Sequence, residues 1–319
     1  MAEFELINRY FSKIGAQRPD TVLSVGDDAA LLNVPEGHTL VVSVDTLVAG
    51  VHFPLDTCAR DIGYKALAVN LSDIAAMAAD PAWATLALTL PEHDDAWLSE
   101  FALGFAEAAK PFGVQLVGGD TTCGPLTITV QIMGYVRQRE CLRRDGARPG
   151  DLIYVTGAIG DGGAGLAVVQ GRATTSVEHA QFLRTRLNRP TPRVTVGRLM
   201  RGIATAAIDI SDGLLADLNH VLERSCVGAT VGVDRVPVSP AAASVSDALG
   251  GWETLLTAGD DYELCLVVPK MRQRALEALA PRLGCACTLI GEIETQRGLR
   301  LVGREGVQLH RQRLGYEHF

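Results

Sequence analysis

The segment RDIGYKALAVNLSDIAAMAADPAWATLALTL, residues 60–90, carries the clearest signal of the fold. Its apolar first part predicts a helix over residues 60–78, with apolar positions spaced for burial against a neighbouring element. The Asp-Pro pair at 80–81 ends this helix, because the residue before a proline disfavours helical backbone. A strand is predicted to follow over residues 84–90, and another precedes the helix over 39–44. Helices and strands therefore alternate in this part of the chain.

The same alternation continues toward the C-terminus. Further predicted strands cover 114–117, 126–136, 152–156, 206–210, 229–233, 262–268 and 288–293, and further predicted helices cover 94–110, 164–170, 179–187, 193–201, 214–223, 239–249 and 271–282. The stretch RRDGARPGD at 143–151 is rich in charge and turn formers, which is typical of a domain boundary. We therefore expect an α+β (mixed α/β) protein of two lobes, with domains at 1–142 and 143–319.

The composition limits the class of protein. Hydrophobic residues make up 47% of the chain and charged residues 21%, which is typical of a compact globular protein. The formal net charge of -8 provides no broad cationic surface, which argues against nucleic acid or a membrane surface as a partner. No apolar run is long enough to span a bilayer and the N-terminus lacks a signal-peptide pattern, so we expect a cytoplasmic protein. The seven cysteines include no C-x-x-C pair, so neither a zinc site nor a disulfide framework is expected.

Most of the prominent aspartates follow a predicted strand or a glycine turn. They are Asp27 and Asp28 after Gly26, Asp45 at the end of the first strand, Asp120 after two glycines, and Asp209 and Asp212 around Ser211, with Asp73 in the apolar helix. Such positions bring short carboxylates to the edge of a sheet, where they can converge. Their mutual repulsion then needs a counter-charge. A hard divalent cation such as Mg²⁺, shared with substrate phosphates, would supply it.

Each of these motifs alone also has a structural interpretation. A glycine-aspartate pair is more often a turn than a metal site, and Ser211 or Asp212 is suited to cap the helix that follows. The segment from Gly160 to Gly165 fits G-x-G-x-x-G, and Glu178 lies at about the distance of a ribose-binding acid, as in dinucleotide sites. The segment lies in the middle of the chain, and Glu178 lies in a polar stretch, so a dinucleotide site is disfavoured. The favoured alternative is a tight turn whose glycines allow close helix packing or approach of the backbone to a phosphate.

Other phosphate-binding motifs are missing from the sequence. It contains no G-x-x-x-x-G-K-[ST] segment and no H-R-D or D-F-G motif of protein kinases. Phosphate chemistry is therefore left to metal ions, backbone amides and arginine, for which Arg143, Arg144 and Arg148 are candidates.

Taken together, eight ordered segments resemble the thiamine-monophosphate kinases, a family in the superfamily of aminoimidazole ribonucleotide synthetase and selenophosphate synthetase. The segments are GDDAA (26–30), SVDTLVAGVHF (43–53), KALAVNLSDIAAM (65–77), GGDTT (118–122), RPGDLIYVTG (148–157), IDISDGL (208–214), DDYEL (260–264) and GYEHF (315–319). The resemblance implies the two-lobed fold of that superfamily, with an N-terminal lobe that forms a sheet or barrel in a homodimer. It places the active site between the lobes.

The resemblance also implies a reaction and its residues. ATP and thiamine phosphate would give ADP and thiamine diphosphate, with several Mg²⁺ ions and direct transfer of the γ-phosphate without a covalent enzyme intermediate. The implied metal ligands are Asp28, Ser43, Val44 through its carbonyl, Asp45, Asp73, Asp120, Asp209 and Asp212, with transfer assisted at Asp120, Asp209 and Asp212. ATP would lie against Gly119, Asp120, Arg144 and Ser211, and thiamine phosphate would meet His52, Asp260 and Tyr316.

Two departures from the family pattern and three alternatives accompany this resemblance. Val44 stands where the family often has threonine, and Asp260 stands where it usually has glutamate, which shortens that acid. Selenophosphate synthetases place a reactive cysteine or selenocysteine near the N-terminus, whereas the first cysteine here is Cys58. Aminoimidazole ribonucleotide synthetase stays open, although His52 and Tyr316 favour the thiamine enzymes. A non-catalytic metal- or nucleotide-binding regulator is the third alternative, which the complete set of aspartates disfavours.

Overall fold

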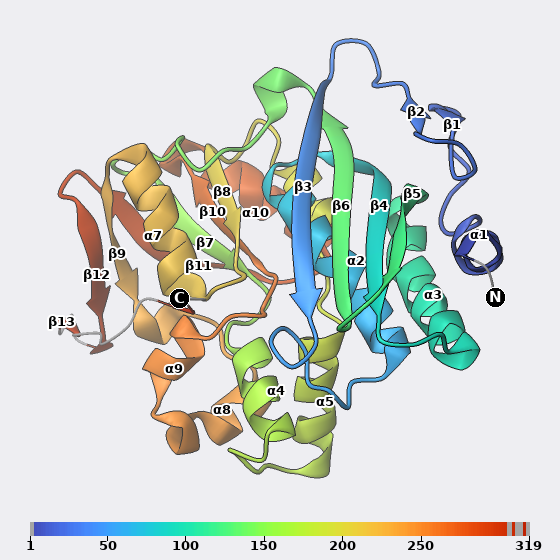
Figure 1. Ribbon diagram of the computed structural model, residues 1–319. Helices are drawn as coiled ribbons and strands as arrows, with labels where there is room; N and C mark the ends of the chain where they lie inside the picture. Colours follow the sequence, from blue (N-terminus) through green and yellow to red (C-terminus); the bar gives the residue numbers. More distant parts are fainter. Residues whose placement is uncertain (1–2, 305–307, 310–314, 317–319) are drawn as a thin grey trace. The chain divides into compact units, whose positions relative to one another are not determined.

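The computed structural model describes residues 3–304, 308–309 and 315–316, and the chain forms two compact units (Figure 1). Unit 1 comprises Met1–Ile74 and Ala79–Arg139, and unit 2 comprises Ala75–Ala78 and Glu140–Phe319. The chain therefore passes from one unit to the other just before the predicted linker at 143–151. The last three residues of the GYEHF segment, 317–319, lie outside the described residues.

Unit 1 is built on a four-stranded sheet with the strand order β3-β6-β4-β5. Its elements are α1 (Glu3–Leu6), η1 (Ile7–Phe11), β1 (Thr21–Leu23), β2 (Leu31–Leu32), β3 (Thr39–Val48), α2 (Ala59–Ala76), β4 (Asp80–Leu90), α3 (Asp95–Ala109), η2 (Lys110–Phe112), β5 (Gln115–Cys123), β6 (Thr127–Val136) and η3 (Gln138–Glu140). Helices α2 and α3 lie behind the sheet in the view of Figure 1. They cross closely because Gly63 and Gly104 carry no Cβ, which would stand 2.1 Å and 1.8 Å from a carbonyl oxygen of the other helix.

The N-terminal segment of unit 1 is tied to the same sheet by polar and aromatic contacts. The Arg18 guanidinium donates to Asp20 and to the Tyr135 hydroxyl, and it lies 5.4 Å from the centre of the Trp83 ring. The Trp83 indole N–H donates to the Thr21 hydroxyl at 2.9 Å. These contacts anchor the chain immediately before the GDDAA segment at 26–30.

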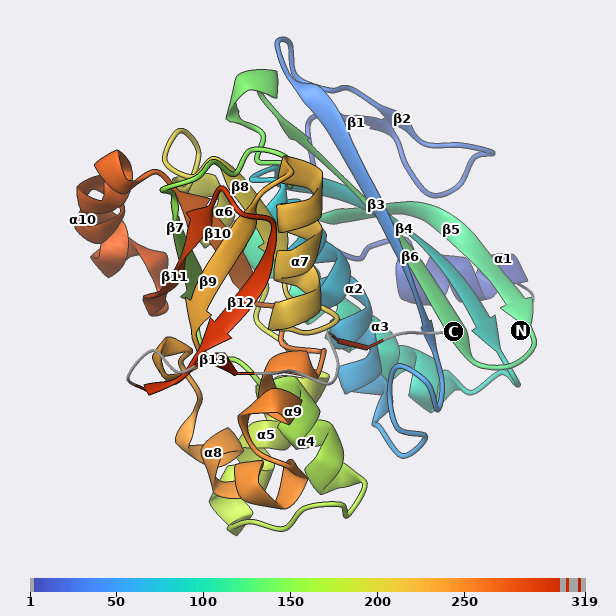
Figure 2. The same ribbon diagram turned by 90° about the vertical axis from the view of Figure 1, so that its left-hand side faces the viewer.

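Unit 2 contains a seven-stranded sheet with the strand order β13-β12-β9-β11-β7-β10-β8. Its elements are β7 (Leu152–Thr156), α4 (Asp161–Val169), α5 (Val177–Asn188), α6 (Val194–Leu199), β8 (Ala206–Asp209), α7 (Leu214–Ser225), β9 (Gly228–Gly232), η4 (Val233–Arg235), α8 (Pro240–Ser246), η5 (Asp247–Leu249), α9 (Trp252–Thr257), β10 (Leu264–Val268), η6 (Lys270–Arg272), α10 (Gln273–Leu283), β11 (Cys287–Glu294), β12 (Gly298–Val302) and β13 (Gln308–Leu309). Figures 1 and 2 show α7 and α10 on opposite faces of this sheet.

Two hydrophobic clusters stabilise unit 2. The larger one joins the sheet to α7, whose Leu214, Leu215, Leu218, Val221 and Leu222 are almost fully buried. This spacing is the buried stripe of an amphipathic helix. A smaller cluster joins α4, α5, α8 and α9 into a helical group.

The mixed α+β class and the two-part layout predicted from the sequence are confirmed. Two local expectations were wrong. The first strand was expected to finish with Asp45 at its end, but β3 continues to Val48 because it pairs with β6 along its whole length. The segment GGD at 118–120 was expected to follow a strand, but β5 continues through it to Cys123 because it pairs with β4 along this stretch. The short elements α1, β1, β2, α9, β12 and β13 were not predicted. Among the described residues, no helix is long and apolar enough to cross a membrane.

Candidate functional site

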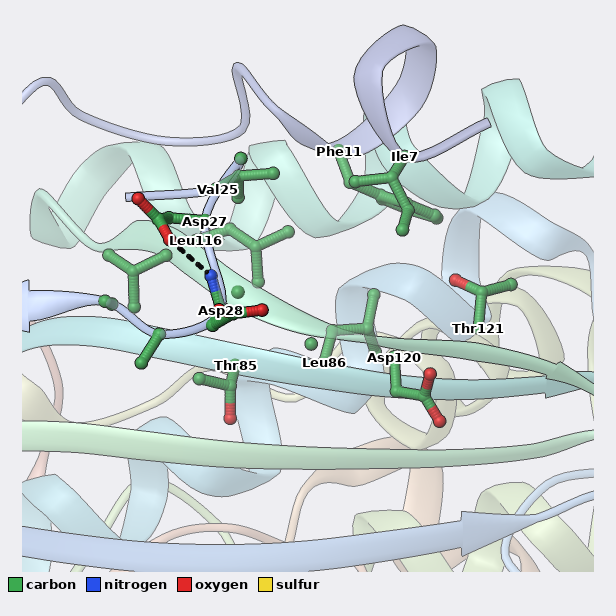
Figure 3. A pocket seen from close by; sticks show the side chains of 16 residues that line it. Ile7, Phe11, Val25, Asp27, Asp28, Thr85, Leu86, Leu116, Asp120 and Thr121 are labelled. Atoms are coloured by element: carbon green, nitrogen blue, oxygen red, sulfur yellow. Dashed lines mark hydrogen bonds between the residues drawn. The ribbon is translucent and has the colours of Figure 1, made fainter. Parts of the chain in front are cut away.

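A cavity of about 620 Å³ in unit 1 collects several of the predicted site residues (Figure 3). Asp27 and Asp28 line it from the loop after β1, and Gly119 and Asp120 line it from β5. The complete lining is Ile7, Phe11, Val25, Gly26, Asp27, Asp28, Ala29, Ala30, Thr85, Leu86, Leu116, Val117, Gly118, Gly119, Asp120 and Thr121. The cavity therefore combines carboxylates, strand backbone and an apolar wall, a mixture that suits a ligand with an anionic part and an apolar part.

The backbone at Gly119 leaves no room for a side chain. A Cβ at this position would stand 1.8 Å from the carbonyl oxygen of Leu86 on the neighbouring strand β4. Glycine is therefore required for β5 to run against β4 here, which places Gly119 and Asp120 in the lining of the cavity.

A second group of predicted residues lies where β3 meets α2. The Ser43 hydroxyl donates to the Asp73 carboxylate at 2.6 Å, although the two residues are 30 positions apart in the sequence. Asp73 is half-buried, so this hydrogen bond offsets part of its desolvation. Asp45 follows Ser43 by two residues on the same strand, and side chains two residues apart in a strand point to the same face.

Asp45 and Asp120 lie on opposite edge strands of the sheet in unit 1. Asp45 is on β3 and Asp120 is on β5, with β6 and β4 between them. Three strand spacings separate their backbones by roughly 14 Å. Because Mg–O bonds are only about 2.0–2.1 Å long, one ion does not reach both carboxylates, and a shared site needs several ions or a bridging polyphosphate.

His52 lies in the loop after β3, where both its backbone and its ring are held. The Val48 N–H donates to Nδ1 of His52 at 3.0 Å, so the neutral ring carries its proton on Nε2. Lys65 of α2 is 2% exposed, and its ammonium donates to the His52 carbonyl at 3.2 Å. This geometry fixes which ring nitrogen of His52 is the hydrogen-bond donor.

In unit 2, the structure brings together four of the predicted residues. The Asp260 N–H donates to the Ser211 carbonyl at 2.9 Å, and the Tyr316 N–H donates to the Asp212 carbonyl at 3.0 Å. Asp209 ends β8 just before this segment and is 4% exposed. The short segment from Asp209 to Asp212 is therefore the centre around which the acidic loop at Asp260 and the C-terminal Tyr316 are arranged.

Asp217 of α7 binds the Asp209–Asp212 segment through hydrogen bonds and was not predicted from the sequence. Its carboxylate, 3% exposed, accepts the backbone N–H groups of Ser211 and Asp212, both at 3.0 Å. Burial and the nearby Asp212 carboxylate raise the pKa of Asp217 to about 7, whereas the Arg144 guanidinium lowers it. Arg144 therefore acts electrostatically on the same group. The sequence signal that could have indicated Asp217 is an acidic residue in the first turn of the helix that follows Ser211 and Asp212.

The glycine-rich turn at Gly160 to Gly165 serves packing. The Gly160 and Gly162 N–H groups donate to the two oxygens of Asp261, at 2.7 Å and 3.0 Å. A Cβ on Gly162 would stand 2.4 Å from the Asp260 carbonyl oxygen. The chain's own carboxylate thus accepts the amide protons that a bound phosphate would need, which supports the packing alternative rather than a dinucleotide site.

Glu263 is the centre of a buried ion network beside this turn. The residue is fully buried, and its carboxylate accepts two hydrogen bonds from Arg193, both at 2.6 Å, and one from Arg186 at 3.0 Å. The Thr156 hydroxyl donates to it at 2.6 Å, and Arg186 also lies 3.4 Å from the Asp161 carboxylate. Hydrogen bonds to Asp261 and Glu263, the second and fourth residues of the DDYEL segment, therefore hold this segment in place.

The oxygen donors of both units fit Mg²⁺ in their chemistry. Within the residues that the structure describes, no group of three or more His, Cys, Asp or Glu side chains is placed to hold a metal ion. Mg²⁺ in phosphate-transfer sites commonly takes only one or two carboxylates and completes its shell with waters and substrate phosphates. The arrangement suits such shared coordination, and binding of Mg²⁺ by these residues stays a prediction.

Comparison with known proteins identifies the family. Residues 26–136 match the model of the AIR synthase related protein N-terminal domain, and residues 148–304 match that of the C-terminal domain. The thiamine-monophosphate kinase of Salmonella typhimurium is 49% identical over 319 residues, which is 99% of this chain and 98% of that protein. The chain belongs to the thiamine-monophosphate kinase family.

Solved structures of thiamine-monophosphate kinases share the fold. The crystal structure of the Stenotrophomonas maltophilia enzyme superposes with a TM-score of 0.85 at 46% identity, covering 92% of this chain and 93% of that one. A structure described as AaThiL complexed with AMPPCP and TMP superposes with a TM-score of 0.79 at 30% identity, covering 90% and 89%. The family predicted from the eight sequence segments is therefore confirmed.

Proposed function

We propose that this chain transfers the γ-phosphate of ATP to thiamine phosphate, giving ADP and thiamine diphosphate. The observation that carries the proposal is the 49% identity over 99% of the chain to a thiamine-monophosphate kinase. Acidic residues recur at the two places described above, the cavity of unit 1 and the Asp209–Asp212 segment of unit 2. A relative bound to AMPPCP and TMP supports a nucleotide and a thiamine phosphate as the two substrates.

Both reactants are anions, which sets the electrostatic task of the site. An oxygen of thiamine phosphate attacks the γ-phosphorus as the bond to ADP breaks, so negative charge must be screened rather than a strong base supplied. The residues proposed to hold Mg²⁺ are Asp28, Ser43, the Val44 carbonyl, Asp45, Asp73, Asp120, Asp209 and Asp212. Bound Mg²⁺ would supply charge neutralisation and orient the phosphates.

The chain's own groups would position the two substrates. Gly119 and Asp120 line the cavity of unit 1 and are proposed to contact ATP there, with Arg144 and Ser211 as further proposed ATP contacts. His52, with its proton on Nε2, is suited to donate a hydrogen bond to the thiamine phosphate. Asp260 and the half-exposed ring of Tyr316 are proposed to contact the same substrate.

A product assay tests the proposed function. The protein is incubated with ATP and Mg²⁺ together with either thiamine phosphate or the aminoimidazole ribonucleotide precursor that is the substrate of the sister synthetase. We expect thiamine diphosphate and ADP in equal amounts from the first acceptor and no ADP from the second. ADP release only with the ribonucleotide would favour the sister enzyme, and no turnover with either would favour a non-catalytic regulator.

We also propose that the chain forms a homodimer through the sheet of unit 1. Strand β3 lies at one edge of that sheet and exposes Leu40, Val42 and Val44 by 43%, 51% and 58%. An apolar stripe on an edge strand is unfavourable in water unless a partner covers it. A cytoplasmic location stays a prediction from the sequence.

Placing a charge in the middle of this stripe should prevent dimer formation. We expect Val42→Lys to sediment with the 33.9 kDa mass of one chain, and the parent protein with twice that mass. Leu103→Lys is the matched control, because Leu103 on α3 is similarly exposed at 47%. Analytical ultracentrifugation would contradict the proposal if Val42→Lys and Leu103→Lys had the same mass.

A further inference from the structure

The DDYEL segment has an unusual backbone. Asp260 and Tyr262 have φ values of 68° and 51°, in the left-handed region that residues other than glycine seldom adopt. Such a conformation persists only where the surrounding structure holds it. The residue between them, Asp261, is 1% exposed.

The Asp261 carboxylate supplies a large part of this support from one side. Each of its oxygens accepts one backbone N–H, from Gly160 at 2.7 Å and from Gly162 at 3.0 Å. These two amides belong to the start of α4, where N–H groups lack partners within the helix and where the helix dipole favours a negative charge. Burial raises the pKa of Asp261, whereas the two N–H donors lower it and so favour the charged carboxylate.

On the other side, the same segment is bonded to the predicted metal-binding segment. The Asp260 and Tyr262 N–H groups donate to the carbonyls of Ser211 and Ile210, at 2.9 Å and 2.8 Å. The Tyr262 hydroxyl donates to the Asp260 carboxylate at 3.1 Å. Asp260 is therefore held between the start of α4 and the chain that leads to Asp212.

We propose that Asp261 is a positioning residue, whose carboxylate locks the start of α4 to the Asp260 loop and so fixes Asp260 where it meets thiamine phosphate. The inference rests on the proposed function, because that function gives Asp260 its substrate. An amide is a poor replacement, since its NH₂ group would face one of the two N–H donors.

A matched pair of glycine substitutions in α4 tests the lock without altering a carboxylate. A Cβ on Gly162 would stand 2.4 Å from the Asp260 carbonyl oxygen, and a Cβ on Gly165 would stand 2.4 Å from the Leu183 carbonyl oxygen. The nearest contact is equally close at both positions, although the Gly162 Cβ also meets the Asp260 carbonyl carbon and the Gly259 carbonyl oxygen, and only Gly162→Ala pushes on the Asp260 loop. We expect Gly162→Ala to raise KM for thiamine phosphate about 10- to 100-fold, with KM for ATP changed less than about twofold.

Three kinetic results would overturn the proposal. The first is that Gly165→Ala has the same effect as Gly162→Ala. The second is that Gly162→Ala raises both KM values equally, because that result indicates general loosening. The third is an unchanged KM for thiamine phosphate in Gly162→Ala.

Hydrogen exchange in Asp261→Asn gives a readout that does not depend on activity. We expect faster exchange at the amides of Asp260 and Tyr262 in this variant, with unchanged exchange along β9. Slow exchange at both amides would overturn the proposed lock even if the enzyme made thiamine diphosphate. Faster exchange in Asp261→Asn, together with no kinase activity in the parent protein, would instead leave the lock intact and contradict only the proposed function. If Asp261→Asn does not fold, Gly162→Ala receives the same exchange measurement and is judged by the same outcomes.

Discussion

Asp120→Asn is expected to lower kcat for thiamine diphosphate formation by about 10²- to 10³-fold, the usual cost of removing one preorganised electrostatic contact. The substitution keeps the shape of the side chain and removes its charge. Asp120 lines the cavity of unit 1 directly after Gly119, and both residues are proposed ATP contacts. Loss of this carboxylate should weaken binding of the proposed Mg²⁺, which would screen the charge of the γ-phosphate.

Steady-state kinetics at several Mg²⁺ concentrations would measure this effect. We expect added Mg²⁺ to restore part of the activity of Asp120→Asn, because a lost ligand lowers metal affinity. Asp247→Asn serves as the control, since Asp247 is exposed and begins the short helix η5 away from the acidic segments. Activity of Asp120→Asn within about twofold of the parent would remove Asp120 from the proposed metal and ATP contacts.

Glu263→Gln is expected to lower the free energy of unfolding by about 3–5 kcal/mol, the typical cost of breaking a buried ion pair from one side. The substitution leaves Arg186 and Arg193 facing a neutral amide in a site where their side chains are only 13% and 14% exposed. For a unit of this size the loss corresponds to a decrease of about 10 °C in the melting temperature.

Differential scanning calorimetry is suited to this comparison. Glu294→Gln is the matched control, because Glu294 pairs with Arg300 but its side chain is 37% exposed. We expect that control to lose at most about 1 kcal/mol, as is usual for surface ion pairs. Equal melting temperatures for Glu263→Gln and Glu294→Gln would show that the buried network does not stabilise unit 2.

Local patterns in the sequence were sufficient for much of the fold. The helix predicted at 60–78 corresponds to α2, and the strand predicted at 39–44 lies within the longer β3, because apolar periodicity and a proline are local signals. The segment GGD at 118–120 was misplaced because glycine is typical of turns, whereas here it lets β5 pass close to β4. A packing requirement of this kind depends on the neighbouring strand, which the local sequence does not specify.

The partners of the site residues were much harder to predict. Ser43 meets Asp73 from 30 positions away, and Asp261 meets Gly160 from 101 positions away, so no local pattern indicates either pair. Lys65 begins the family segment at 65–77, but the sequence did not indicate its contact. Its burial and its hydrogen bond to the His52 carbonyl show that it holds the His52 loop. The sequence identified which residues carry charge, whereas the fold determines which groups those charges contact.

The most direct test of the central claim is ³¹P NMR of the purified protein with ATP, thiamine phosphate and Mg²⁺, repeated with EDTA in excess over Mg²⁺. We expect the thiamine phosphate signal to be replaced by the two coupled signals of a diphosphate, as ADP accumulates, and no change in the EDTA sample. Inorganic phosphate as the main product, or the same diphosphate signals with EDTA present, would contradict a metal-dependent transfer of phosphate to thiamine phosphate.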